Sequence, residues 1–146
     1  MAHIEGDIVI RRPVEVVFDF VADTRNEPRY NSRMLHVEKA SDGPVGLGTR
    51  FEARTRSGGR DVPLLVEITK YERARSLASR THLSGMDIEG TLTFEPVPGG
   101  TRMSWSWSIE PHGLPKLLSP LIGWMGERQE RAIWTGLKTH LEGAAA

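Results

Sequence analysis

Between Leu35 and Glu110 the chain is a succession of stretches in which apolar and polar residues alternate, separated by short turns that contain glycine. Alternation with a period of two places every second side chain on the same face, which is typical of a half-buried β-strand. No stretch with helical periodicity interrupts these residues. Consecutive strands joined by short turns pair as antiparallel neighbours, so this region predicts an antiparallel meander with one face in water.

Six strands are expected within this region, and a further strand is expected near the start of the chain. The early strand covers residues 3–11, where isoleucines alternate with polar residues. The later strands are expected over residues 35–39, 50–56, 62–71, 77–83, 88–94 and 101–109. The sequence therefore predicts a seven-stranded sheet.

Two helical segments flank the meander. Pro13 is suited to the first turn of a helix, and apolar residues follow it at helical spacing as far as about Asp23. A short turn or a second helix is expected around Tyr30. The last helix begins near Pro115 or Pro120 and ends at Glu142.

This order of elements predicts an α+β fold with a curved antiparallel sheet around the C-terminal helix. The apolar face of seven strands is larger than one helix can cover. The space that remains between them is either filled by side chains or forms a cavity. The length of 146 residues suits one domain, and no repeat or linker divides residues 1–146.

Composition narrows the range of functions. The chain has 19 basic and 19 acidic residues and a formal net charge of zero, without the basic excess typical of nucleic-acid binding. It has no cysteine, which excludes disulfides, thiolate metal sites and a cysteine nucleophile. The start of the chain lacks the pattern of a signal peptide, and the longest apolar run, 114–125, is too short to cross a bilayer. We expect a cytoplasmic protein without integral membrane association; whether it forms a homodimer is left open.

Two segments carry a resemblance to a known family. They are residues 8–18 (IVIRRPVEVVF), followed by Asp23 and the Arg29-Tyr30-Asn31 triplet, and residues 136–142 (GLKTHLE). With the order of elements, they resemble the helix-grip fold of the SRPBCC superfamily. That superfamily includes START lipid-transfer domains, plant pathogenesis-related allergens and polyketide cyclase/dehydrase proteins. Many relatives carry tryptophan where this chain has Tyr30. The resemblance implies a deep, largely apolar cavity between the long helix and the sheet.

Several features of the sequence agree with such a cavity. The last strand sends two indoles to its inner face, and the strand over 77–83 sends two hydroxyl groups there. The apolar stripe of the last helix contains Gln129, and Gly136 leaves a gap on it. Apolar walls with a few inward polar groups are typical of small-molecule sites. The residues expected to line the cavity are Tyr30, Leu64, Val66, Leu77, Ser79, Thr81, Ile88, Leu92, Met103, Trp105, Trp107, Leu118, Ile122, Met125, Gln129 and Ile133.

Each of these residues also has a structural interpretation. Large aromatic residues dominate core burial, so Trp105 and Trp107 suit an ordinary core as well as a ligand platform. Gln129 is equally suited to a bond with a nearby carbonyl group.

The sequence gives no convincing catalytic constellation. Its five histidines lack the spacing of a metal site, no serine follows the nucleophile pattern, and the glycine-rich segment 43–48 lacks the ending of a phosphate loop. We therefore expect neither a metal nor a cofactor. Acid–base candidates near the cavity mouth are Asp23, Tyr30, Arg128, Arg102 and Glu110.

Three functions remain open. The first is a module that binds a small hydrophobic or aromatic molecule, and it follows from the cavity alone. The second is a polyketide cyclase, aromatase or dehydratase, which needs inward-facing titratable groups with shifted pKa values. The third is a protein-interaction module, which a solidly packed inner face and an exposed apolar patch would favour.

Overall fold

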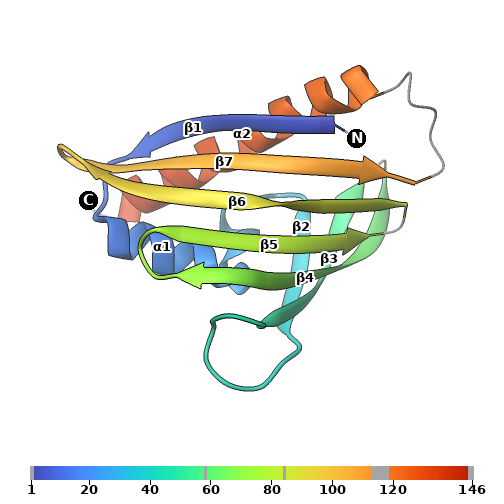
Figure 1. Cartoon of the computed structure of the whole chain (residues 1–146), viewed down its shortest axis with the longest axis horizontal. Coiled ribbons are helices and arrows are strands. Elements are labelled where there is room, and N and C mark those ends of the chain that lie inside the picture. Colours follow the sequence, from blue (N-terminus) through green and yellow to red (C-terminus); the bar gives the residue numbers. More distant parts are fainter. Residues whose placement is uncertain (1, 58, 84, 113–118, 145–146) are drawn as a thin grey trace.

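A computed structural model describes residues 2–57, 59–83, 85–112 and 119–144, the side chains of 119–122 and 144 excepted (Figure 1). Its seven strands form one antiparallel sheet in the order β1-β7-β6-β5-β4-β3-β2. The strands are β1 (Ala2–Ile10), β2 (Met34–Lys39), β3 (Arg50–Ser57), β4 (Arg60–Glu72), β5 (Ser76–Leu83), β6 (Met86–Val97) and β7 (Gly100–Pro111). The predicted seven-stranded antiparallel sheet is confirmed.

The sheet is strongly curved. Figure 1 shows β2 and β3 running steeply across the direction of β6 and β7. The pairing is irregular at two places, between Met34 and His36 and between Ile68 and Lys70. Such irregularities bend a strand and increase its twist, so they help to curl this end of the sheet.

In the part of the chain that the structure describes, three helical segments cover the concave face. Helix α1 (Val14–Ala22) and the 3₁₀ helix η1 (Thr24–Arg29) follow β1, and helix α2 (Ser119–Ala144) closes the chain. The predicted start of the last helix at Pro120 is one residue from the observed one, whereas the alternative at Pro115 lies outside the described residues. The helix continues past its predicted end at Glu142.

Basic side chains of α2 bind the edge of the sheet. Lys138 donates from Nζ to the carbonyl oxygen of Val9 at 2.7 Å, and Arg131 donates from Nη1 to that of Asp7 at 3.0 Å. These carbonyl groups belong to β1, an edge strand whose outer backbone groups have no strand partner. The helix therefore covers this edge and is fixed along β1.

The core lies where α1 packs on the sheet. Phe18 is fully buried and meets two rings edge-on, with centroids 5.2 Å from Tyr71 and 5.0 Å from Phe94. From α2, Leu137 and Leu141 are buried in the same cluster. This packing fixes one end of the space between α2 and the sheet and leaves the other end for a site.

Candidate functional site

A cavity of about 210 Å³ lies between α2, η1 and the inner face of the sheet. Side chains of β4, β5 and β6 form its apolar wall, and these three strands contribute no charged residue to it. The lining includes Leu64, Val66, Ile68, Leu77, Ser79, Thr81, Leu83, Ile88 and Leu92 from these strands. The opposite wall is polar and comes from α2, η1 and the segment after η1.

Glu130 of α2 is the central polar group of this wall. Its Oε2 atom accepts hydrogen bonds from two indoles, Trp134 Nε1 at 2.7 Å and Trp107 Nε1 at 3.2 Å. The pKa of Glu130 is raised to about 7: burial is the main cause, the negative charge of Glu27 contributes to the rise, and the indole hydrogen bonds oppose it. The group therefore changes its charge near neutral pH.

Glu27 of η1 is the second carboxyl group of the cavity. Its Oε2 atom accepts a hydrogen bond from Asn31 Nδ2 at 2.8 Å. Burial raises the pKa of Glu27, and the Asn31 bond opposes the rise. Glu27 and Glu130, here called the carboxyl pair, thus share one polar wall, and the charge of Glu27 raises the pKa of Glu130.

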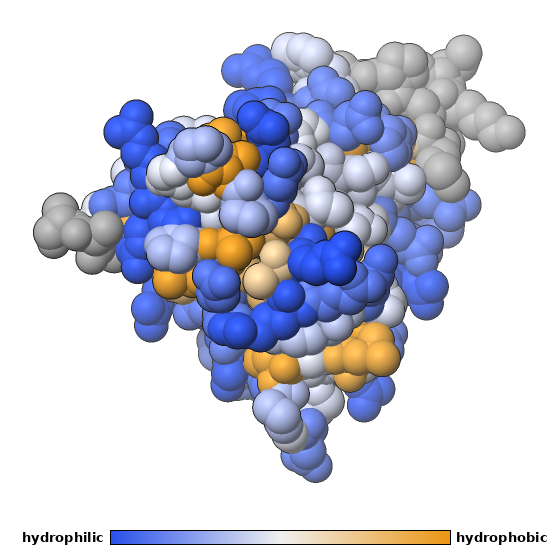
Figure 2. Space-filling view, turned by 60° about the vertical axis from the view of Figure 1, so that its left-hand side comes forward, coloured by the Kyte–Doolittle hydropathy of each residue, from blue (hydrophilic) through white to orange (hydrophobic). Residues whose placement is uncertain are grey.

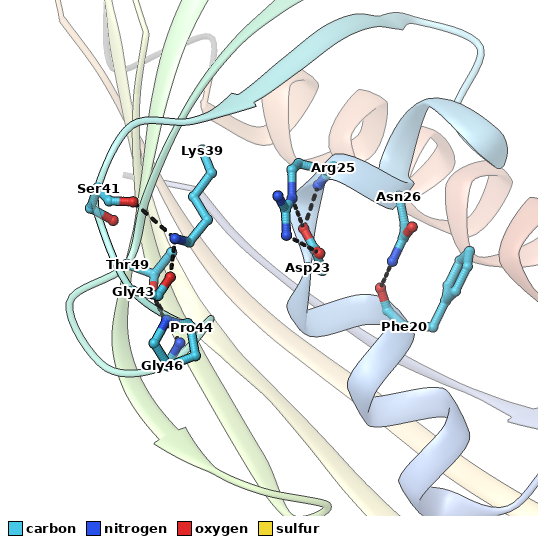
Figure 3. A network of polar contacts seen from close by, with 10 residues as sticks. All are labelled: Phe20, Asp23, Arg25, Asn26, Lys39, Ser41, Gly43, Pro44, Gly46 and Thr49. Atoms are coloured by element: carbon cyan, nitrogen blue, oxygen red, sulfur yellow. Dashed lines mark hydrogen bonds and ion pairs between the residues drawn. The ribbon is translucent and has the colours of Figure 1, made fainter.

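The η1 segment that carries Glu27 is held by its own polar contacts (Figure 3). Asp23 Oδ1 accepts a hydrogen bond from the backbone nitrogen of Arg25 at 3.1 Å. The Arg25 guanidinium donates two more to the same carboxylate, from Nε to Oδ1 at 2.9 Å and from Nη2 to Oδ2 at 2.8 Å. Asn26 Nδ2 donates to the carbonyl oxygen of Phe20 at 3.0 Å. These bonds attach η1 to the end of α1, which fixes the direction in which Glu27 points.

Tyr30 lines the cavity directly after η1. Its ring centroid lies 6.0 Å from that of Trp134 and 6.0 Å from that of Phe20. Burial raises the pKa of its hydroxyl group well above the usual value, and the charges of the carboxyl pair raise it further. Tyr30 is therefore a neutral hydroxyl group under ordinary conditions.

Residues 1–142 match the family described as polyketide cyclase / dehydrase and lipid transport. The chain belongs to this family. Among curated proteins, none matches it in sequence.

Several solved structures share the fold of this family member. A START superfamily protein from Mycobacterium smegmatis has a TM-score of 0.85 at 11% identity, with 99% of each chain covered. The Zhui aromatase/cyclase from a Streptomyces species has a TM-score of 0.82 at 13% identity, covering 99% of this chain and 95% of that one. A protein from Thermus thermophilus has a TM-score of 0.79 at 21% identity, with 99% of each covered. At these identities the similarity shows the helix-grip fold alone.

Most of the residues expected to line a cavity do line this one. They are Tyr30, Leu64, Val66, Leu77, Ser79, Thr81, Ile88, Leu92, Trp107, Gln129 and Ile133. Leu118 lies outside the described residues, and so does the side chain of Ile122. The structure thus brings together side chains from four strands, α2 and the segment after η1.

Two expected cavity residues of β7 lie in the core instead. Met103 is fully buried, and Trp105 is 3% exposed. The Trp105 ring is turned across Gly6 of β1, where a Cβ atom would lie 2.5 Å from its Cζ2. The Arg131 guanidinium lies 5.1 Å from the centroid of this ring. The alternating pattern of β7 therefore predicts correctly that Trp105 points to the inner face of the sheet. It does not predict that the indole turns toward β1 and away from the cavity.

The prediction for Met125 was also wrong, because the inner face of α2 is rotated from its apolar stripe. Met125 is 57% exposed. The face turned inward passes through Gly126 and Glu130, and at about 100° per residue Met125 is directed away from it. The predicted stripe contains Met125 and Gln129 but neither Gly126 nor Glu130. For the same reason the sequence missed Glu130 and Trp134 as cavity residues.

Gly136 leaves no gap. A Cβ atom at this position would lie 2.5 Å from the carbonyl oxygen of Tyr30. The glycine therefore allows the backbone after η1 to touch α2, and a larger residue here would require these two segments to move apart.

The remaining acid–base candidates lie elsewhere. Asp23 binds Arg25, and Arg128 lies over the exposed Trp124 ring at 5.1 Å from its centroid. Arg102 and Glu110 are exposed on β7. Among the candidates only Tyr30 belongs to the described cavity lining.

Within the described residues, no three histidine, aspartate or glutamate side chains are arranged to hold a metal ion. No described helix is long and apolar enough to span a membrane.

Proposed function

We propose that this protein binds a small apolar or aromatic molecule in the cavity between α2 and the sheet. The observation that carries the proposal is the division of the cavity into an apolar strand wall and a polar wall with fixed hydrogen-bonding groups. An apolar lining supplies affinity, and a few placed polar groups orient the ligand. Membership of a family described by polyketide cyclisation and lipid transport supports the same function.

The size of the cavity restricts the ligand. A volume of about 210 Å³ is below the ~300–1,000 Å³ of sites for drug-sized molecules. A molecule of one or two rings suits this volume, whereas a long polyketide or acyl chain requires a wider cavity. Gln129 is exposed at the edge of the cavity and bonds to Arg33 at 3.1 Å, and this pair is placed to open or restrict the mouth.

A direct test uses a neutral bicyclic probe and a variant that fills the cavity. We expect naphthylmethanol to bind the wild-type protein and to change the fluorescence of Trp107 and Trp134, which line the cavity. Ser79→Leu enlarges the side chain at the apolar wall, and we expect it to weaken binding at least about tenfold by a steric clash. The matched control is Ser57→Leu, at an exposed position at the end of β3.

Native mass spectrometry of the purified protein complements this titration by revealing any molecule that co-purifies. If naphthylmethanol leaves the tryptophan fluorescence and the melting temperature of the wild-type protein unchanged, the cavity is not a binding site for molecules of this class. Equal affinities of Ser79→Leu and wild type, with both folded, would place the ligand elsewhere.

One observation favours a second function, enzymatic proton transfer. A general acid–base catalyst works best when its pKa lies near the working pH, and the pKa of Glu130 is raised to about 7 inside the cavity. Removal of a proton beside a ligand carbonyl group and its return to a leaving hydroxyl group is the chemistry of enolisation and dehydration. The test is turnover of a small β-hydroxy ketone: loss in Glu130→Gln with retained substrate binding supports this function, and turnover unaffected by the change excludes Glu130 from it.

The protein-interaction alternative has less support. An interaction module would be favoured by a solidly packed inner face, whereas this inner face borders a cavity. On the face shown in Figure 2, apolar residues form several separate areas among charged ones. Isolated apolar residues at a surface are normal and carry no argument for an interface.

A further inference from the structure

In each member of the carboxyl pair, one oxygen atom accepts hydrogen bonds from the protein and the other is available to a ligand. In Glu130 both indole hydrogen bonds go to Oε2, and in Glu27 the Asn31 bond also goes to Oε2. Among the described residues no side chain donates a hydrogen bond to the Oε1 atom of either carboxyl group. A ligand with hydrogen-bond donors therefore finds two acceptors in one wall.

The hydrogen bonds to the carboxyl pair stabilise its charge but bring no positive charge to it. All three donors, the two indoles and the Asn31 amide, are neutral. The described lining of the cavity contains no arginine, lysine or histidine, and the guanidinium of Arg33, which is outside this lining, donates to the exposed Gln129. The interior therefore favours a positive charge and disfavours a carboxylate or phosphate.

Aromatic rings border the same wall. The rings of Tyr30 and Trp134 are tilted by 32° with their centroids 6.0 Å apart, and the Trp107 indole lines the same cavity. The faces of such rings attract cations, and ammonium ligands are recognised in this way. Acidic and aromatic groups thus select for the same ligand charge.

We infer that the cavity selects an organic amine, protonated, on an aromatic or apolar body of one or two rings. Its ammonium group binds the free oxygen atoms of Glu130 and Glu27, while its body contacts the strand wall. This inference rests on the proposed binding function and adds the charge of the ligand.

Binding of an amine is then linked to a proton. The titratable groups that face Glu130 are Glu27 and Tyr30 from the η1 side; β7 contributes the neutral Trp107 indole, and β4, β5 and β6 contribute uncharged side chains. An ammonium ion stabilises the ionised form of Glu130 and lowers its pKa, so binding near pH 7 releases a proton from this group. Affinity for the amine therefore increases as the pH rises through 7 and Glu130 ionises.

The experiment compares three probes that share one ring system: naphthylmethylamine, naphthylmethanol and naphthoate. Calorimetry at pH 8, where the amine is protonated, measures their dissociation constants for the wild-type protein. We expect the amine to bind at least about tenfold more tightly than the alcohol, and naphthoate to bind most weakly. Amine titrations near pH 7 in two buffers of different ionisation enthalpy measure the released proton.

Glu130→Gln keeps a side-chain oxygen that accepts the indole hydrogen bonds and removes the negative charge. We expect it to lose the preference for amine over alcohol by about tenfold while the alcohol affinity changes little. Glu127→Gln, an exposed position on the same helix, is the matched control and should retain the preference.

The outcomes separate the two proposals. Equal affinities for all three probes, or the tightest binding by naphthoate, would overturn the amine inference and leave the binding function in place. Failure of every probe to bind would overturn the binding function itself. Because the probe series and the proton measurement need only the wild-type protein, a failure of Glu130→Gln to fold does not affect them.

Discussion

The indole of Trp107 packs across Gly90 on the neighbouring strand, so closely that a Cβ atom at Gly90 would lie 2.5 Å from Cε3 of the ring. Trp105, two residues earlier on β7, packs in the opposite direction across Gly6. The two glycines thus direct one indole toward the cavity and its hydrogen bond with Glu130, and the other toward the β1 edge.

This relationship predicts the effect of Gly90→Ala. The added methyl group collides with the Trp107 ring and with the carbonyl oxygen of Ser106. We expect a loss of about 1–3 kcal/mol in the free energy of unfolding, as for overpacked cores, and weaker probe binding because Trp107 is displaced. Urea denaturation measures the first and fluorescence titration the second. Thr93→Ala, at an exposed position of β6, is the control and should leave probe binding unchanged. If Gly90→Ala also bound the probe as the wild type does, Gly90 would not control the position of the Trp107 indole in the cavity.

Trp134→Phe tests the hydrogen bonds of Glu130. The variant keeps an aromatic ring and removes the donor at 2.7 Å. Because this bond stabilises the ionised carboxylate, its loss should raise the pKa of Glu130 above about 7. A pH titration of the glutamate side-chain carbons by NMR measures the change.

Trp107→Phe removes the longer bond of 3.2 Å and should shift the pKa less. The control is Trp124→Phe, because Trp124 is 55% exposed and outside the cavity lining. The same pKa in all three variants would mean that the indole groups do not stabilise the charge of Glu130.

Gly136→Ala tests the contact between α2 and the backbone after η1. A Cβ atom here would approach the carbonyl oxygen of Tyr30 to 2.5 Å, so we expect destabilisation of about 1–3 kcal/mol. Gly143 provides a matched control on the same helix, because nothing lies within 4 Å of a Cβ atom there. Gly143→Ala should gain up to about 1 kcal/mol through the higher helix propensity of alanine. Thermal unfolding measures both; a stabilising Gly136→Ala would show that the two backbones can separate freely.

The fold could be predicted from the sequence because each strand carries its own alternating pattern. The pairing of β2 to β7 with their neighbours in the chain follows from the short turns that join them, and the strand faces follow from residues such as Leu77 and Leu92. These signals are local, and each is repeated over several residues.

The polar wall of the cavity could not be predicted in the same way. Glu130 looks like a solvent-exposed helix residue in the sequence, and only the neighbouring indoles and the closing η1 segment bury it. The burial of Glu27 likewise depends on where η1 lies relative to α2. One available signal was the pair of glycines opposite the tryptophans of β7, which indicates where large rings cross the sheet.

The raised pKa of Glu130 predicts how stability depends on pH. The folded-state pKa is about 7, and the ordinary value is 4.5. Between these values the unfolded chain has released this proton while the folded protein still holds it, so the unfolded state binds fewer protons. The contribution of Glu130 to stability therefore falls as the pH rises from about 4.5 to 7 and is constant above that, a loss of about 3 kcal/mol. The burial of Glu27 raises its pKa and acts in the same direction.

Glu130→Gln isolates this contribution. The amide does not titrate, so the variant should lack the loss of stability that Glu130 causes. Its unfolding free energy relative to that of the wild type should therefore increase between about pH 5 and 7. Urea denaturation at several pH values in this interval measures the difference in unfolding free energy. Glu127→Gln should follow the wild-type curve, since Glu127 is exposed on the same helix. Parallel curves for Glu130→Gln and wild type would mean that Glu130 titrates at its ordinary value, and that the cavity does not hold a proton near neutral pH.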